Sequence, residues 1–181
     1  MPDKPTRADK ISDAFLVLGS QYYTLARYCA DRQYLPVSVT LFNHAVEMLL
    51  KGFISKTSPT TNLKDLGHNL VKLWQIFKAQ GNVPQFSKFD TAITNLNRVE
   101  ALRYPTAMVD DGFVLNVRFG TKTPLVFPGT EELPPYFVDV SDLDEIAAAV
   151  FAACSVPAGA YFVDVPPELK RALPPLLAPA E

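Results

Sequence analysis

The segment 42–54, FNHAVEMLLKGFI, carries polar side chains at helical spacing within an otherwise apolar run. When residues 40–51 are placed on a helix at about 100° per residue, their polar side chains fall within an arc of roughly 100°. An imidazole beside a carboxylate can exchange protons near neutral pH, and a carboxylate beside an ammonium group can hold a polar ligand. We call this set the polar ridge. It comprises Thr40, Asn43, His44, Glu47 and Lys51.

The rest of this helix is apolar around about two-thirds of its circumference, which predicts a central helix with neighbours on most sides. Two interpretations of the polar ridge remain open. It is either the solvent-exposed strip of a helix that is otherwise buried, or the lining of a cleft or dimer seam. In the second case we expect Arg98 and Arg103, from a later helix, to hold Glu47 and His44. An exposed Glu–Lys pair at i and i+4 contributes only about 0.2–0.5 kcal/mol, so stability alone hardly requires one.

The composition indicates one globular core. The chain has 181 residues, of which 48% are hydrophobic and 20% are charged, and these values suit a single folded domain. The net charge of −2 divides into +5 over residues 1–105 and −7 over residues 106–181. Six lysines and one acid, Asp65, lie from Lys51 to Lys88. This bias either attracts phosphate-bearing ligands or keeps the surface solvated.

Several classes of function lack the residues that they need. No uninterrupted apolar run reaches the roughly 18 residues of a membrane span, and the first residues lack a secretory signal, so we expect a cytoplasmic protein without membrane contact. Cys29 and Cys154 are expected to be reduced and buried. The two histidines, His44 and His68, do not stand at metal-binding spacing, and no glycine-rich nucleotide loop is present. We therefore expect no metal and no cofactor, and we expect His68 to cap a helix or bind adjacent backbone.

Hydrophobic periodicity predicts a mainly α protein. Pro36 suits the first turn of the second helix, and Pro105 ends the fourth. Ser141 and Asp144 form a capping-box pattern at the start of the fifth. In the first helix we expect one buried stripe of Ile11, Phe15, Leu18, Tyr22, Leu25 and Cys29. The predicted helices cover residues 8–32, 36–55, 63–79 with a start at either Leu63 or His68, 84–104 and 141–155.

Short runs rich in valine and aromatic residues follow position 105 and predict strands of a small β-hairpin or meander. These runs are residues 113–120, 124–127 and 136–140. The last 26 residues hold six prolines and predict an extended arm. The predicted organisation is an antiparallel bundle of four or five helices with its core over residues 1–105, a β-rich insert over 106–140, a fifth helix over 141–155 that completes the bundle, and a proline-rich C-terminal arm over 156–181.

Three segments resemble motifs of the HEPN domain family. HAVEMLLKGFI, residues 44–54, is similar to the Ala-x-Glu-x-x-x-Lys pattern of the family's second helix. GHNLVKL, residues 67–73, is similar to the family's His-(Asp/Asn)-Leu-x-x-Leu, and LRYP, residues 102–105, to the Arg-Tyr-Pro that closes its next long helix. The resemblance covers about residues 8–110. It implies a bundle of four or five helices that often pairs into a symmetric dimer.

The nucleolytic members of the family share an arginine that is followed four to six residues later by a histidine. Neither Arg98 nor Arg103 has a histidine at that distance. The resemblance therefore implies a non-catalytic homodimer that binds a nucleotide, RNA or a protein partner such as a nucleotidyltransferase. The expected site is a groove between the second and fourth helices. Its residues are Asn43, His44, Glu47, Lys51, Arg98, Arg103 and Tyr104.

Two alternatives to this binding module remain open. The first is a toxin-like, metal-independent endoribonuclease that uses Arg98 or Arg103 with His44 in an altered arrangement. The second is a scaffold whose proline-rich arm and acidic C-terminal part recruit another protein.

Overall fold

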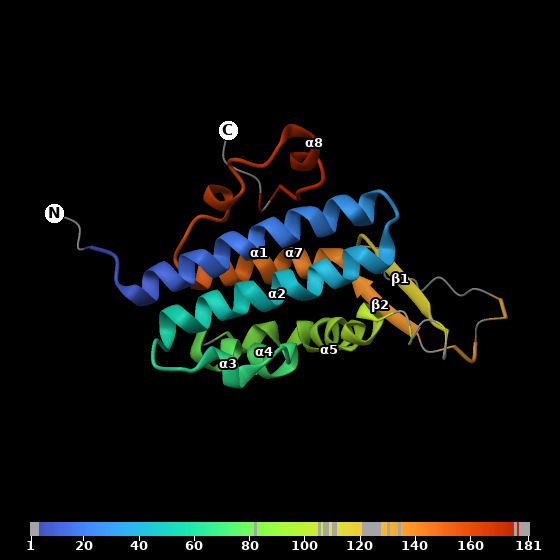
Figure 1. Ribbon diagram of the computed structural model, residues 1–181, viewed down its shortest axis with the longest axis horizontal. Coiled ribbons are helices and arrows are strands. Elements are labelled where there is room, and N and C mark those ends of the chain that lie inside the picture. Colours follow the sequence, from blue (N-terminus) through green and yellow to red (C-terminus); the bar gives the residue numbers. More distant parts are fainter. Residues whose placement is uncertain are drawn as a thin grey trace.

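The computed structural model describes residues 4–81, 83–104, 106, 109, 112–120, 128–129, 131–133, 135–175 and 177. These residues form a mainly helical protein with one small two-stranded sheet (Figure 1). The elements are α1 (Arg7–Asp31), α2 (Leu35–Thr57), α3 (Leu63–Leu66), α4 (Leu70–Gly81), η1 (Pro84–Phe89), α5 (Asp90–Arg98), η2 (Val99–Arg103), β1 (Val114–Arg118), β2 (Pro135–Asp139), α7 (Val140–Ala153), η3 (Ala158–Tyr161) and α8 (Pro167–Lys170), where η denotes a 3-10 helix.

The α1–α2 hairpin is the centre of the fold. α1 begins at a capping box, in which the hydroxyl of Thr6 accepts from the backbone N–H of Asp9 while the Asp9 carboxylate accepts from the backbone N–H of Thr6. α2 begins with Pro36 in its first turn, where a missing N–H costs nothing. The helices predicted over 8–32 and 36–55 are therefore confirmed to within two residues.

The face that α1 buries differs from the predicted stripe. Ile11, Leu18 and Leu25 are 38%, 44% and 44% exposed. A Cβ on Gly19 would lie 2.8 Å from Cγ of Leu49, so α1 meets α2 along a line of small residues that hydropathy does not mark. The buried face of α1 consists of Ser12, Leu16, Gly19, Ser20, Tyr23, Thr24, Ala26 and Ala30.

Residues 63–103 form a series of short helices along α2, as Figure 1 shows. Gly67, with a φ of 60°, ends α3, and α4 begins three residues later at Leu70, so the third predicted helix is divided. The continuous helix predicted over 84–104 is wrong, because α5 is flanked by the 3-10 helices η1 and η2. Such tighter turns are common where an α-helix ends.

The two strands pair in parallel, so the predicted hairpin or meander is wrong. Val117 on β1 lies opposite Val138 on β2. The alternation of side chains along a strand has the same period for either direction of pairing, and the sequence pattern therefore did not distinguish them. The strand predicted over 124–127 lies outside the described residues.

Helix α7 follows β2 directly and packs against α2. The side chain of Asp139 caps it by accepting from the backbone N–H of Ser141 at 3.0 Å. The predicted capping box of Ser141 and Asp144 is wrong, because Asp144 points inward and accepts from Tyr23 and Arg27. A buried salt bridge thus takes the place of the expected cap.

The segment after α7 is not an extended arm over its described part. It forms η3 and α8, and it buries Phe162 and Leu177 in the same core as the long helices. Figure 1 shows this segment folded along α1. Its prolines begin or separate short helical turns, which is compatible with their fixed φ.

Helix α2 lies between α1 and α7 on one side and α4 on the other. Among the described residues it is the one helix long and apolar enough to cross a membrane by length and composition, and 72% of that apolar window is buried inside the protein. The predicted central position of this helix accounts for its hydropathy.

Candidate functional site

The polar ridge of α2 is largely buried. Glu47 is 0% exposed, Asn43 is 1% exposed and Lys51 is 8% exposed, so the ridge is not the solvent-exposed strip that one interpretation expected. The start of α4 and the residues of α5 and η2 cover it. A buried carboxylate is costly unless it is paired and hydrogen-bonded, and the partners of Glu47 therefore decide what the ridge can do.

Glu47 is the centre of a cluster of polar groups. Nζ of Lys51 donates to its Oε1 at 2.7 Å. Nδ1 of His68 lies 3.0 Å from both carboxylate oxygens, and Nδ1 of His44 lies 3.9 Å from Oε2. One carboxylate thus faces an ammonium group and two imidazoles. We call Glu47, Lys51, His44 and His68 the Glu47 cluster.

His68 reaches Glu47 because two neighbouring residues fix the junction between α3 and α4. Gly67 ends α3 in a positive-φ conformation. Asn69 begins the next helix, and its side-chain oxygen accepts from the backbone N–H of Lys72 at 2.9 Å. The expected capping role of His68 is therefore wrong. Asn69 provides the cap, and His68 bonds a side chain instead.

The contact with Glu47 sets the tautomer of His68. An ionised carboxylate only accepts hydrogen bonds, so Nδ1 of His68 must donate to it. Nε2 is then left for another partner, and the His68 side chain is 66% exposed. In the neutral ring Nε2 is then an acceptor, so it can accept a hydrogen bond from a ligand hydroxyl or N–H group or take up a proton. The accessible part of the Glu47 cluster is thus the outer edge of His68.

Arg103 lies in electrostatic range of the Glu47 cluster. Its NH1 group donates to the carboxylate of Glu100, one turn earlier in η2. The pKa of Arg103 is raised, first by its hydrogen bond and charge pairing with Glu100 and to a smaller extent by the charge of Glu47. Tyr104 follows and is 64% exposed. The Arg-Tyr pair of the LRYP motif therefore lies at the surface.

Arg98 does not join the cluster. Its guanidinium lies over the ring of Tyr136 in β2, 5.4 Å from the ring centroid, which is a cation–π distance. The expectation that Arg98 holds Glu47 or His44 therefore lacks a contact among the residues that the structure describes. The last turn of α5 directs this side chain to the sheet.

Asn43 and His44 occupy structural positions. Nδ2 of Asn43 donates to the backbone oxygen of Leu96 at 3.0 Å and joins α2 to α5. The ring of His44 lies 5.7 Å from the ring of Tyr22 in α1. Asn43 is buried, and the side chain of His44 is 22% exposed. We therefore assign both of them to helix packing.

None of the residues of the predicted groove lines the three cavities described in the protein, which have volumes of about 730, 470 and 310 Å³. No group of three histidine, cysteine or acidic side chains that could hold a metal ion was found among the described residues. Cys29 and Cys154 are free thiols, and burial raises the pKa of Cys154 to about 11. A ligand from solvent would therefore meet the Glu47 cluster at the exposed side chain of His68.

Comparisons of the chain with protein-family models, with curated proteins and with solved structures find no match.

Proposed function

We propose that this chain is a non-catalytic, HEPN-like module that binds RNA on a surface formed by the exposed residues His68, Arg103 and Tyr104, of which His68 contacts Glu47. We call these three exposed residues the surface patch. The observation that carries the proposal is the contact between Nδ1 of His68 and the carboxylate of Glu47 at 3.0 Å. This contact leaves the other ring nitrogen of an exposed histidine for a ligand.

The three segments that resemble HEPN motifs support this proposal by their arrangement. Glu47 and Lys51 come from the second-helix segment, and His68 comes from the GHNLVKL segment. The two segments contact each other through the Glu47–His68 pair. Arg103, from the LRYP segment, lies in electrostatic range of Glu47. Motifs far apart in the chain thus contribute to one place.

The form of the surface patch favours a polymer over an enclosed small molecule. The described cavities lie elsewhere, and small-molecule sites are usually concave. Lys64 and Lys72, in the helices on either side of His68, are exposed. Single-stranded RNA offers phosphates for these cations and bases that stack on an exposed ring such as that of Tyr104.

The lysine-rich segment contributes less positive charge than its composition indicates. Lys51 is paired with Glu47, Lys78 with Asp90 and Lys88 with Glu145. Lys56 donates to the backbone oxygen of Cys154 at 2.5 Å. These four lysines are committed to contacts within the protein. Binding is therefore expected to depend on a small number of phosphate contacts and to have a shallow salt dependence.

A homodimer formed through α1 is part of the proposal. Ile11, Leu18 and Leu25 are exposed and spaced seven residues apart, which is the period of a coiled-coil seam. An antiparallel pairing about a two-fold axis at Leu18 would place Ile11 of one copy beside Leu25 of the other. Sedimentation of the wild type and of Leu18→Asp tests this part, and a wild-type monomer at high concentration would contradict it.

A second candidate is a metal-independent endoribonuclease that uses His68 in place of His44. The specific observation in its favour is the carboxylate that orients the imidazole, since catalytic histidines are commonly oriented in this way. Nε2 of His68 would take the proton from a ribose 2′-hydroxyl, whose oxygen would attack the adjacent phosphorus. The bond from phosphorus to the 5′-oxygen would break, and this oxygen would take a proton from water, while Arg103 would stabilise the charge on the phosphate.

One experiment tests both candidates. Labelled single-stranded RNA is titrated with the protein by fluorescence anisotropy, and the same samples are run on a denaturing gel with a chelator present. We expect binding without cleavage, and we expect His68→Ala and Arg103→Ala each to weaken it about tenfold. Arg32→Ala is the matched control, because Arg32 is an exposed arginine between α1 and α2 that does not belong to the surface patch. RNA affinity that is equal in all three variants would refute the proposed surface patch.

Cleavage would change the assignment. If RNA is cut by the wild type, if the cutting survives the chelator, and if it is lost in His68→Ala, the endoribonuclease replaces the binding module. Cleavage that persists in His68→Ala would indicate a contaminating nuclease, because the proposed chemistry has no other base.

A further inference from the structure

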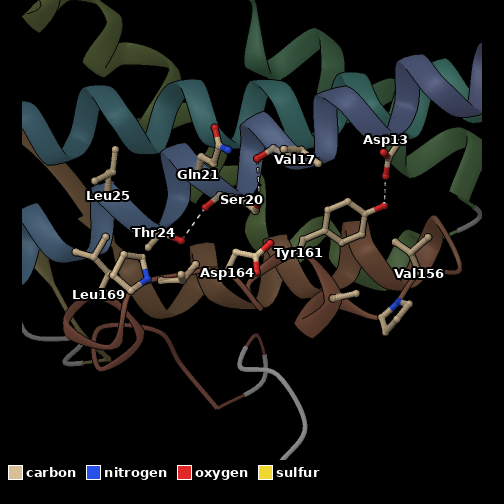
Figure 2. Close-up of a pocket in the computed structure, with 14 residues that line it drawn as sticks. Asp13, Val17, Ser20, Gln21, Thr24, Leu25, Val156, Tyr161, Asp164 and Leu169 are labelled. Atoms are coloured by element: carbon tan, nitrogen blue, oxygen red, sulfur yellow. Dashed lines mark hydrogen bonds between the residues drawn. The ribbon is translucent and has the colours of Figure 1, made fainter.

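A cavity lies between α1 and the C-terminal segment, and residues of the Glu47 cluster do not line it. Its volume is about 730 Å³, within the range of sites for small organic molecules. Figure 2 shows α1 along one side and the residues after α7 along the other. None of its lining residues belongs to the polar ridge or the surface patch. The cavity is therefore separate from the surface patch, although it shares Leu25 with the proposed dimer seam of α1.

The wall formed by the C-terminal segment is held in place by specific contacts. The hydroxyl of Tyr161 donates to the carboxylate of Asp13 at 2.8 Å, as Figure 2 shows. Nε of Arg27 donates to the backbone oxygen of Ala172. Phe162 is fully buried next to Tyr161 and lies against Phe151 of α7. These contacts preform the cavity, which lowers the entropy lost when a ligand binds.

The lining of the cavity is mostly apolar, and its charged side chains are negative. Val17 and Leu25 of α1 line it together with Val165 and Leu169 of the C-terminal segment. Among the described residues that line it, Asp13 and Asp164 are the charged ones, and none of them is a lysine, arginine or histidine. Asp164 is exposed and has no hydrogen bond or ion pair within the described part of the chain. An anion would meet two carboxylates there without a compensating cation.

We propose that this cavity binds a small organic cation with an apolar body, of the alkylammonium or arylalkylammonium class. The apolar body would pack between Val17 and Val165, and the ammonium group would pair with Asp164. The ring of Tyr161, beside Asp164 in Figure 2, offers a face for a cation–π contact. Tyr161 remains a neutral donor to Asp13, because burial and this hydrogen bond raise the pKa of its phenol well above the usual value.

The test compares three probes of equal chain length that differ only in head group: n-octylammonium, n-octanol and n-octanoate. Each is titrated into the full chain at neutral pH, below its micellar concentration, and backbone amide shifts are recorded by NMR. We expect octylammonium to bind about tenfold more tightly than octanoate, with octanol between them, because only the ammonium group gains from the carboxylates. The shifted amides should cluster at Val17, Tyr161, Val165 and Leu169.

Two variants with the same change of charge separate the cavity from the general surface. Asp164→Asn should weaken octylammonium about fivefold and leave octanol unchanged. Asp31→Asn removes an exposed acid at the end of α1, outside the cavity, and should change neither affinity. Asp164 and Asp31 are both exposed, so both variants are expected to fold.

Three outcomes would overturn the proposal. Equal affinity for octanoate and octylammonium would show an apolar surface without charge selection. Equal weakening by Asp164→Asn and Asp31→Asn would show general electrostatic attraction. Failure of all probes to shift the cavity amides would show that the site does not take this class. The RNA titration of His68→Ala reads a different surface, so failure of one proposal is distinguishable from failure of the other.

Discussion

The imidazole of His68 joins the buried centre of α2 to the protein surface through Glu47, because its Nδ1 lies 3.0 Å from both carboxylate oxygens while its side chain is 66% exposed. Lys51 contacts the same carboxylate from one turn further along α2. The three side chains therefore form one charged group with an inner part, Glu47 and Lys51, and an outer part, His68. The inner part is expected to carry stability and the outer part to carry binding.

The first prediction concerns this division. Glu47→Gln removes a buried negative charge and leaves the ammonium of Lys51 without its counter-charge. Breaking a buried pair in this way typically costs about 3–5 kcal/mol, and we expect the free energy of unfolding to fall by about 3 kcal/mol. Urea denaturation followed by circular dichroism measures it. His68→Ala should cost less than about 1 kcal/mol, because its side chain is largely in water.

The control for Glu47→Gln is the double variant Glu47→Gln, Lys51→Met. Removing both charges should recover most of the lost stability, because no uncompensated charge is left in the core. A double variant as unstable as Glu47→Gln alone would contradict the assignment of the loss to Lys51.

The second prediction concerns the close contact between α1 and α2. Alanine favours helices over glycine by about 1 kcal/mol, but a Cβ at Gly19 would lie 2.8 Å from Cγ of Leu49 and 3.2 Å from the Leu49 backbone nitrogen. The steric cost should win, and Gly19→Ala is expected to lower the free energy of unfolding by about 1–3 kcal/mol. The thermal melting temperature measures it.

Gln21→Ala, two residues away and exposed, is the matched control for Gly19→Ala. It should leave the melting temperature unchanged or raise it slightly, since alanine has the higher helix propensity. If Gly19→Ala also raised it, the helices would not be as close as the structure places them.

The third prediction concerns Arg27, which contacts both α7 and the C-terminal segment. Its NH1 group donates to Asp144 at 2.6 Å, and its Nε donates to the backbone oxygen of Ala172. Arg27→Met keeps most of the volume and leaves the Asp144 carboxylate without its cation. We expect a loss of about 3 kcal/mol and faster proteolysis between residues 155 and 175. Lys10→Met, an exposed position on the same helix, should change neither quantity.

The pH dependence of Arg27→Met follows from the state of Asp144. Burial raises the pKa of this carboxyl above its usual value, and Tyr23 and Arg27 oppose that rise. Without Arg27 the pKa should rise further. A raised folded-state pKa adds stability below the unfolded pKa that is lost as the pH rises through the folded value. Arg27→Met should therefore be less destabilising near pH 5 than near pH 8, and the opposite order would contradict this account.

The sequence was sufficient to predict the helices whose ends are marked by neighbouring residues. The ends of α1 and α2 follow from their periodicity and from Pro36. The buried face of α1 was not predictable from hydropathy, because Gly19 and Ala26 form its contact while Leu18 remains exposed. The parallel direction of β1 and β2 also escaped prediction, since strand patterns carry no direction.

The candidate site was predicted in part. Spacing on one helix identified Glu47 and Lys51 as neighbours, because positions i and i+4 share a face. The contact between Glu47 and His68 depends on tertiary packing over 21 residues of sequence. The sequence nevertheless held a signal for this contact. His68 stands between Gly67, which ends α3, and Asn69, which caps α4, and His44 is the one other histidine of the chain. Because Gly67 and Asn69 fix the backbone on either side of His68, they also limit the direction in which its side chain leaves the backbone.

The last prediction concerns acid stability and uses Trp74, the single tryptophan of the chain. Its indole nitrogen donates to Asp90 at 2.7 Å, and Lys78 donates to the same carboxylate at 2.6 Å. The hydrogen bond from Lys78, with that from Trp74, holds the pKa of Asp90 below its usual value despite some desolvation. A depressed folded-state pKa gives stability that is present above the unfolded pKa and is lost as the pH falls through the folded value.

Asp90→Asn should therefore lower the melting temperature near pH 6, and the difference from the wild type should shrink towards pH 3. The asparagine side-chain oxygen can still accept from the indole, so the loss reports the charge rather than the hydrogen bond. Tryptophan fluorescence follows the unfolding directly at the contact between α4 and α5. Asp65→Asn, an exposed acid in α3, is the control and should show no such convergence. A constant difference between Asp90→Asn and the wild type at every pH would mean that Asp90 acts through packing and not through its charge.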